Sequence, residues 1–205
     1  MSMVITLHRV SDSNLQRVLA HPPYFNRILF PDDPACWGNE SLSAPQKGGG
    51  LFARLFGRPQ PALTAATPLP PAPEFASGEL QTLELDKVWH GVHYLFTGSE
   101  QPTPEPAGFL MAGTELEARD LDYGRIISAA DIRAVDTQLR SLSDAELQAR
   151  YQPEHMNMLD VYGKPWHPDP DMEEDLAFLM SAIAELRPFV AEAAARNEGL
   201  FVTLG

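Results

Sequence analysis

Asp86, His90 and His93 are spaced so that a helix would bring them near one face. They occupy positions i, i+4 and i+7 of an apolar segment, and a carboxylate one turn from an imidazole can orient that ring. In this arrangement His90 would act as a general base, and Asp86 would hold its tautomer. The two histidines could also offer two nitrogens to a metal ion. These residues are therefore the candidates for catalysis and for metal binding.

A metal site needs at least a third ligand, which this segment does not supply. Later residues that folding could bring close are His155, Asp160, His167 and Asp169. Lone helical histidines serve more often as hydrogen-bonded structural groups. The spacing therefore favours a polar network that fastens a buried helix, and we expect no metal and no cofactor.

A second group of candidates lies between residues 155 and 171, where acidic and aromatic residues accompany three prolines. Tyr162, Trp166 and His167 on a stiff loop suit recognition, because proline lowers the cost of ordering and exposed aromatic rings are common anchors. The alternative is that the two aromatic rings cover the core beneath the loop. The residues expected to bind a partner or ligand also include Trp89, Tyr94 and Arg125.

The composition restricts the class of function. The chain carries 28 acidic and 15 basic residues, a formal net charge of −13, which repels nucleic-acid phosphates. An acidic surface either maintains solubility or meets a basic partner. The single cysteine, Cys36, forms no intrachain disulfide, and the first ten residues are too short an apolar stretch for export or membrane insertion. We therefore expect a cytoplasmic protein without a membrane span that does not bind nucleic acid.

Apolar spacing and turn residues predict the main elements. The expected elements are a strand at 4–7, helices at 11–20 and 86–97, a strand at 125–127, helices capped by Ser128 and Ser143, a long helix at 172–197 with Pro188 inside it, and a strand at 200–204. Proline inside a helix predicts a kink or two abutting helices, and Gly199 is expected to supply a left-handed cap. Residues 45–78 are rich in proline and glycine, as in an insertion or flexible linker.

The run Leu85-Asp86-Lys87-Val88-Trp89-His90-Gly91-Val92-His93-Tyr94-Leu95-Phe96-Thr97-Gly98 resembles the central helix of the YfbM-like family, a domain of unknown function. Arg125–Ser128, the 142–151 segment, Met156, the Tyr162–Trp166 turn and the final helix and strand follow in the same order. The resemblance implies one α+β domain over 1–205, with a small sheet flanked by helices, a long C-terminal helix and a final strand. It implies no reaction.

Two functions from different classes remain open. The absence of a P-loop, GxGxxG, HExxH or nucleophile-elbow pattern favours a non-catalytic interaction protein. Such a protein, immunity-like or inhibitory, would use its acidic surface to bind a basic protein partner. The alternative is a small-molecule-binding or metal-dependent enzyme centred on Asp86, His90 and His93.

Overall fold

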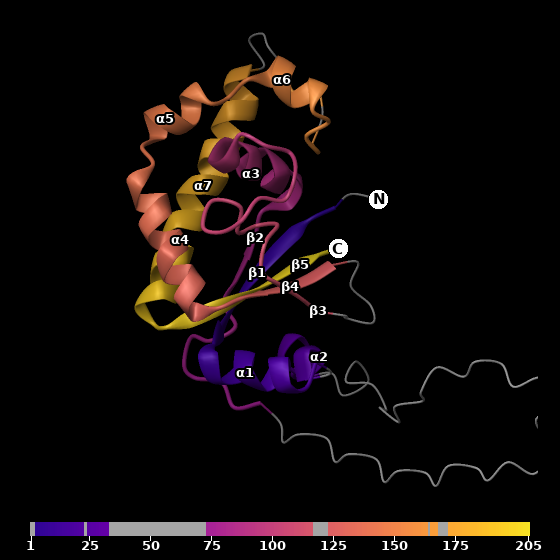
Figure 1. Cartoon of the computed structure of the whole chain (residues 1–205), viewed down its shortest axis with the longest axis vertical. Helices are drawn as coiled ribbons and strands as arrows, with labels where there is room; N and C mark the ends of the chain where they lie inside the picture. The colour runs from indigo at the N-terminus through magenta and orange to yellow at the C-terminus, as the bar shows by residue number, and fades with distance from the viewer. Residues whose placement is uncertain (1–2, 23, 33–72, 117–122, 164, 168–171) are drawn as a thin grey trace, which may run out of the picture.

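The computed structural model describes residues 3–22, 24–32, 73–116, 123–163, 165–167 and 172–205. An antiparallel sheet of five strands, in the order β2-β1-β5-β4-β3, runs through the middle of this part of the chain (Figure 1). The strands are β1 (Ile5–Ser11), β2 (Thr82–Glu84), β3 (Thr114–Leu116), β4 (Tyr123–Ile127) and β5 (Glu198–Leu204). The expected α+β class is confirmed.

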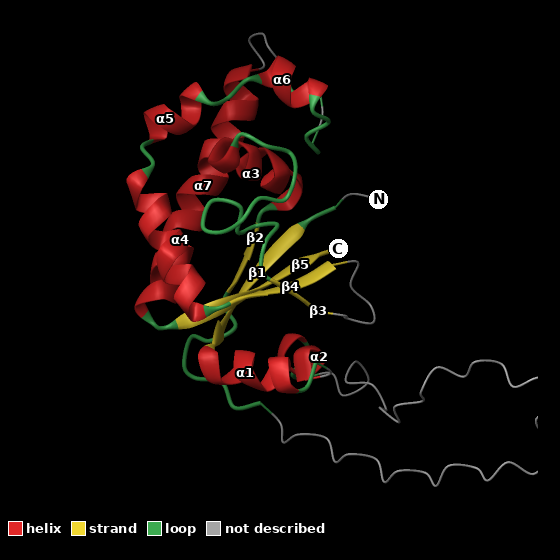
Figure 2. Cartoon of the chain, in the orientation of Figure 1, coloured by secondary structure: helices red, strands yellow, loops and turns green. Residues whose placement is uncertain are grey.

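Helices cover both faces of the sheet (Figure 2). One face carries α1 (Asp12–Ala20) and α2 (Tyr24–Leu29). The opposite side carries the 3₁₀ turn η3 (Asp86–Val88), α3 (Trp89–Thr97), α4 (Ala129–Ser141), α5 (Asp144–Ala149), α6 (Pro153–Met158) and α7 (Met172–Ala195). None of the described helices has both the length and the apolarity needed to cross a bilayer.

Alternating side chains of the central strands supply two separate cores. Leu7 and Ile127 belong to the larger core, beneath α3, α4 and α7. Val10, Ile126 and Phe201 belong to a smaller core with α1 and α2. Because successive strand residues point to opposite faces, one sheet can support both layers of helices.

The helix starts that the sequence predicts are confirmed by their caps. Ser11 precedes α1, and its hydroxyl accepts from the Asn14 amide; Ser128 accepts likewise from the Asp131 amide. Ser143 and Glu146 form a reciprocal capping box at the start of α5. Each cap satisfies an amide that has no partner within its own helix, so these boundaries are local properties of the sequence.

The expected cap at Gly199 is wrong. Gly199 lies within β5, opposite Val10, and the positive φ of 55° belongs to Asn197. A Cβ at Gly199 would lie 2.3 Å from Leu15 Cδ1 and 2.4 Å from the Ile127 carbonyl oxygen. Glycine is therefore required for the close approach of β5 to its neighbours, while asparagine tolerates the left-handed turn.

Two other expectations concern the continuity of the chain. The long predicted helix is observed as α7, a single helix with Pro188 inside it. The proline- and glycine-rich segment 45–78 lies mostly outside the described residues, which resume at 73. Residues 73–76 approach β2 without regular secondary structure.

Arg9 connects β1 to three other parts of the chain. Its side chain is 2% exposed and forms ion pairs with Glu192 of α7, at 2.7 Å, and with Glu198 of β5, at 3.2 Å. It also donates to the carbonyl oxygen of Gly78, and its guanidinium lies 5.7 Å from the centre of the Phe189 ring. Burying an arginine is tolerated only when its charge is paired, and Glu192 and Glu198 provide that pairing, although Nε approaches Glu198 without a hydrogen bond.

Replacing Arg9 with methionine should strongly destabilise the fold. The variant keeps an apolar stem but removes one of the two cations paired with the buried Glu198, the other being Arg196. This loss should lower the free energy of unfolding by about 1 to 3 kcal/mol. Arg140→Met is the matched control, because Arg140 is 67% exposed and pairs with Asp136 one turn away. That exposed pair should contribute less than about 0.5 kcal/mol. Equal losses for the two variants in urea unfolding would contradict this role of Arg9.

Candidate functional site

Both ring nitrogens of His90 have backbone partners. Nδ1 accepts from the Tyr162 amide at 2.9 Å, and Nε2 lies 2.8 Å from the carbonyl oxygen of Glu100. Because a carbonyl oxygen only accepts, Nε2 carries the proton and the ring is a neutral tautomer. Burial lowers the pKa of His90 below its ordinary value, although Glu100 partly opposes this shift. His90 therefore fastens α3 to two loops.

His93 is completely buried one turn further along α3. Its Nε2 donates to the Gln101 carbonyl oxygen at 3.0 Å, and its Nδ1 has no hydrogen-bond partner. Burial is the main cause that lowers the pKa of His93, and the neighbouring His90 lowers it further. The ring is thus neutral, and its Nδ1 retains an unused lone pair in the protein interior.

The structure does not bring Asp86 to His90. Asp86 is exposed in η3, before α3 begins, whereas the tautomer of His90 is set by the Tyr162 amide and the Glu100 carbonyl. No three His, Cys, Asp or Glu side chains in the described ranges lie close enough to hold a metal ion. Among the later metal candidates, His155 contacts Tyr94, and Asp169 lies outside the described residues.

Trp89 and Tyr162 hold the start of the chain against α3. The Trp89 indole donates to the Met3 carbonyl oxygen at 3.3 Å, and the Tyr162 hydroxyl accepts from the Met3 amide at 2.8 Å. Trp89 stacks on the His90 ring with 4.9 Å between centroids, and on Tyr162 at 6.1 Å. The Trp89 indole and the Tyr162 hydroxyl therefore form these hydrogen bonds within the protein. Trp89 is buried, and Tyr162 is partly exposed.

Trp166 lies against the middle of α3. It is 4% exposed, and its indole donates to the Val161 carbonyl oxygen at 3.0 Å. Asn157 holds its backbone on both sides, accepting from the Trp166 amide and donating to the Trp166 carbonyl. A Cβ at Gly91 would lie 2.6 Å from Trp166 Cη2, so glycine lets the indole approach the helix closely. This placement corresponds to the alternative in which Trp166 covers the core.

The other three expected binding residues lie apart from one another in the chain. Tyr94 is buried, and its hydroxyl is 2.7 Å from His155 Nδ1. Arg125 of β4 pairs with Glu115 and donates to a backbone carbonyl in the segment before β3. His167 is exposed and donates its backbone amide to Asp175 at 3.1 Å.

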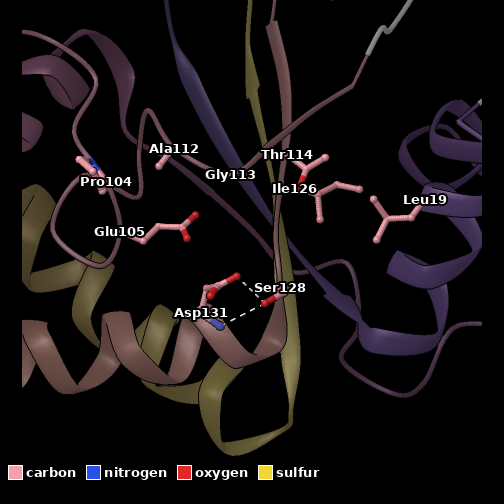
Figure 3. Close-up of a pocket in the computed structure, with 9 residues that line it drawn as sticks. All are labelled: Leu19, Pro104, Glu105, Ala112, Gly113, Thr114, Ile126, Ser128 and Asp131. Carbon is pink, nitrogen blue, oxygen red and sulfur yellow. Dashed lines mark hydrogen bonds between the residues drawn. The ribbon is translucent and has the colours of Figure 1, made fainter.

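A separate pocket of about 370 Å³, which the sequence did not reveal, lies at the edge of the sheet beside the start of α4 (Figure 3). Its walls come from α1, the segment before β3, the paired strands β3 and β4, and the first turn of α4. The lining residues are Leu19, Pro104, Glu105, Ala112, Gly113, Thr114, Ile126, Ser128 and Asp131.

Glu105 and Asp131 give this pocket its charge. Asp131 accepts from the Ser128 hydroxyl, and its amide donates back to that hydroxyl at 3.2 Å. Glu105 Oε1 is enclosed and has no hydrogen-bond partner. Burial, and then the negative charge of Asp131, raise the pKa of Glu105. A carboxylate oxygen that is shielded from water without a donor is costly, so a cationic group beside this carboxylate would be stabilised.

The histidines of α3 should make folding less stable in acid. Burial lowers the pKa of His90 and His93, and lowers that of His8 in β1 to about 4. The unfolded chain binds these protons first, so the stability is complete above the ordinary histidine pKa of about 6.5. It is lost as the pH falls from there, with the His8 contribution lost by about pH 4.

Nuclear magnetic resonance titration of the imidazole carbons measures these pKa values directly. Urea unfolding as a function of pH measures the accompanying change in stability. The expected result is ring titration below the ordinary value for all three histidines, together with an unfolding free energy that decreases toward acid. Midpoints at or above the ordinary histidine pKa would contradict the neutral assignments.

Truncating Trp166 distinguishes a core residue from a recognition residue. Trp166→Ala removes a buried indole from above Gly91 and should cost about 3 to 5 kcal/mol of stability. His167→Ala is the matched control, because its side chain is exposed in the same segment. Thermal melting should show a large loss for Trp166→Ala and little change for the control. A nearly unchanged melting temperature in Trp166→Ala would argue against the core assignment.

The comparisons with known proteins agree with this architecture. The model of a family described as a domain of unknown function (DUF1877) matches residues 1–203. The crystal structure of YfbM from Escherichia coli, a protein of unknown function, is similar with a TM-score of 0.61 and 12% identity, covering 98% of this chain and 99% of that chain. At this identity, the likeness shows the fold alone. No curated protein matches the chain. The expected resemblance is confirmed, and the chain belongs to the DUF1877 family of domains of unknown function.

Proposed function

We propose that this protein is a non-catalytic interaction protein, of an immunity-like or inhibitory kind, that binds a basic protein partner. The observation that carries the proposal is an imbalance in how charges are used. In the described part of the chain the arginines are engaged within the fold, whereas several exposed carboxylates form no ion pair. This excess of acidic groups, part of a net charge of −13, supports binding to an external basic partner.

The arginines in the described part of the chain are used internally. Five form ion pairs with acidic residues, namely Arg9, Arg125, Arg140, Arg187 and Arg196. Arg150 donates instead to the backbone carbonyls of Leu95 and Phe96, and Arg133 donates to Asn197. These guanidinium groups stabilise the fold, and their engagement limits how far they neutralise acids elsewhere.

Exposed carboxylates outside these ion pairs occur on several elements. Within the described ranges they include Glu74, Glu84, Asp86, Glu154, Glu174 and Glu185. Exposed carboxylates attract a basic partner over about one Debye length, roughly 10 Å at 0.1 M salt. Such charges speed association and select a partner by charge, which is how an immunity or inhibitory protein would cover a cationic target.

Binding is favoured over catalysis by the state of the histidines. A general base needs an accessible lone pair, but the Nδ1 of His90 accepts from a backbone amide, and that of His93 is buried. We place this activity in the cytoplasm, in keeping with the single cysteine, Cys36.

Capture on the immobilised chain, from a lysate of its own organism, tests the proposal. One basic protein should co-purify in a fixed ratio. The association rate of the two purified proteins should fall at least about tenfold between low and high salt, because salt screens the steering field. A combined Glu74→Gln, Glu84→Gln and Glu154→Gln variant should associate more slowly and lose part of the salt dependence.

Two results would overturn the proposal. The first is a stoichiometric partner that is itself acidic. The second is an association rate that ignores ionic strength in both the native chain and the triple variant. A circular dichroism spectrum of the triple variant that matches the native chain serves as the control for folding.

A further inference from the structure

The pocket beside α4 combines an acidic end with an exposed apolar end. Figure 3 shows Glu105 and Asp131 on one side of the strands and Leu19 on the other. Leu19 is 44% exposed, which is high for a large apolar side chain. No lysine, arginine or histidine is among the residues that line this pocket, all of which lie in described ranges. The carboxylates therefore face the cavity without a cation from its walls.

We propose that this pocket receives an arginine or lysine side chain of the partner protein, with the cationic head between Glu105 and Asp131 and adjacent apolar atoms of the partner over Leu19. This inference rests on the proposed function and assigns its anchoring site. The Glu105 carboxylate, of which Oε1 lacks a hydrogen-bond partner, would accept from the incoming cation. A charge-assisted hydrogen bond would then satisfy an acceptor that the isolated chain leaves unpaired.

The chemistry of the lining selects an organic cation over other ligands. An anion would meet two carboxylates, and the positive end of α4 is already engaged by Asp131 in its first turn. Calcium takes six to eight oxygen ligands, and the described residues offer no cluster of three metal-binding side chains here. Arginine and lysine carry an apolar stem with a charged head, which matches a pocket of mixed lining.

Ionisation of Glu105 should accompany binding. Burial and Asp131 raise the pKa of Glu105 in the free chain, and a cation beside the carboxylate favours its charged form. Binding should therefore release protons where Glu105 is partly protonated, and affinity should rise with pH through that range. The Glu105→Gln variant should lose this proton release.

The test uses defined small probes with the full chain. N-acetyl-arginine methylamide and N-acetyl-lysine methylamide are titrated by nuclear magnetic resonance, with the neutral N-acetyl-norleucine methylamide as the control ligand. The basic probes should shift the amides of Gly113, Thr114 and Asp131. Glu105→Gln should weaken them at least about fivefold, because one member of the charge pair is removed. Asp136→Asn, which removes one negative charge from α4 at the pair with Arg140, should leave their affinity unchanged.

The same variants are then tested against the captured partner. Glu105→Gln should weaken that complex at least about tenfold, with Asp136→Asn, which removes a carboxylate of the Arg140 pair, close to the native chain. Asp131→Asn provides a second variant if Glu105→Gln alters the fold, which thermal melting reveals. Equal probe binding by Glu105→Gln and the native chain, or equal binding of the norleucine probe, would overturn the site.

The outcomes also separate this inference from the proposed function. Basic probes could bind at Glu105 while the affinity for the partner is the same in Glu105→Gln and the native chain. This result would mean that the pocket binds a free cation, and it would overturn the anchoring role alone. Salt-dependent binding of a basic partner without any probe binding would overturn the pocket's role as the anchoring site. The proposed interaction function would stand. Absence of any basic partner would overturn both.

Discussion

The ion pairs of Arg9 are the constraint that joins the first strand, β1, to α7 and β5 near the other end of the sequence. Arg9 lies in β1, yet its partners come from α7, from β5 and from the segment before β2. A buried guanidinium is costly without partners for its charge. The sheet, the long helix and the entry to β2 therefore each contribute to keeping Arg9 stable in the interior.

Local chemistry determined what the sequence could predict. Ser128 and Ser143 predicted the starts of their helices because a cap acts within four residues. The apolar stripe of residues 172–197 predicted α7. Three-residue strands such as Thr82–Glu84 and Thr114–Leu116 carry too little periodicity to be recognised. Gly199 was misread because its role is a close approach to Leu15 and Ile127, which are distant in sequence.

The candidate site shows the same limit. Helical spacing correctly placed His90 and His93 on α3, but it could not show that backbone groups of residues 100, 101 and 162 would occupy their nitrogens. Glu105 gave no signal, since it lies in a proline-rich connection and meets Asp131 only after folding. Only the folded structure shows that its Oε1 is shielded from water without a donor. The pocket is therefore formed by contacts between segments that are distant in sequence.

The position of β5 in the sheet has a consequence for biosynthesis. This strand lies between β1 and β4, although it follows α7 in chain order. While the ribosome is still making α7, β1 and β4 expose unpaired backbone edges and the halves of two unfinished cores. Docking of β5 completes the sheet and both cores, so the facing edges of β1 and β4 are open to pairing with other chains until β5 is available.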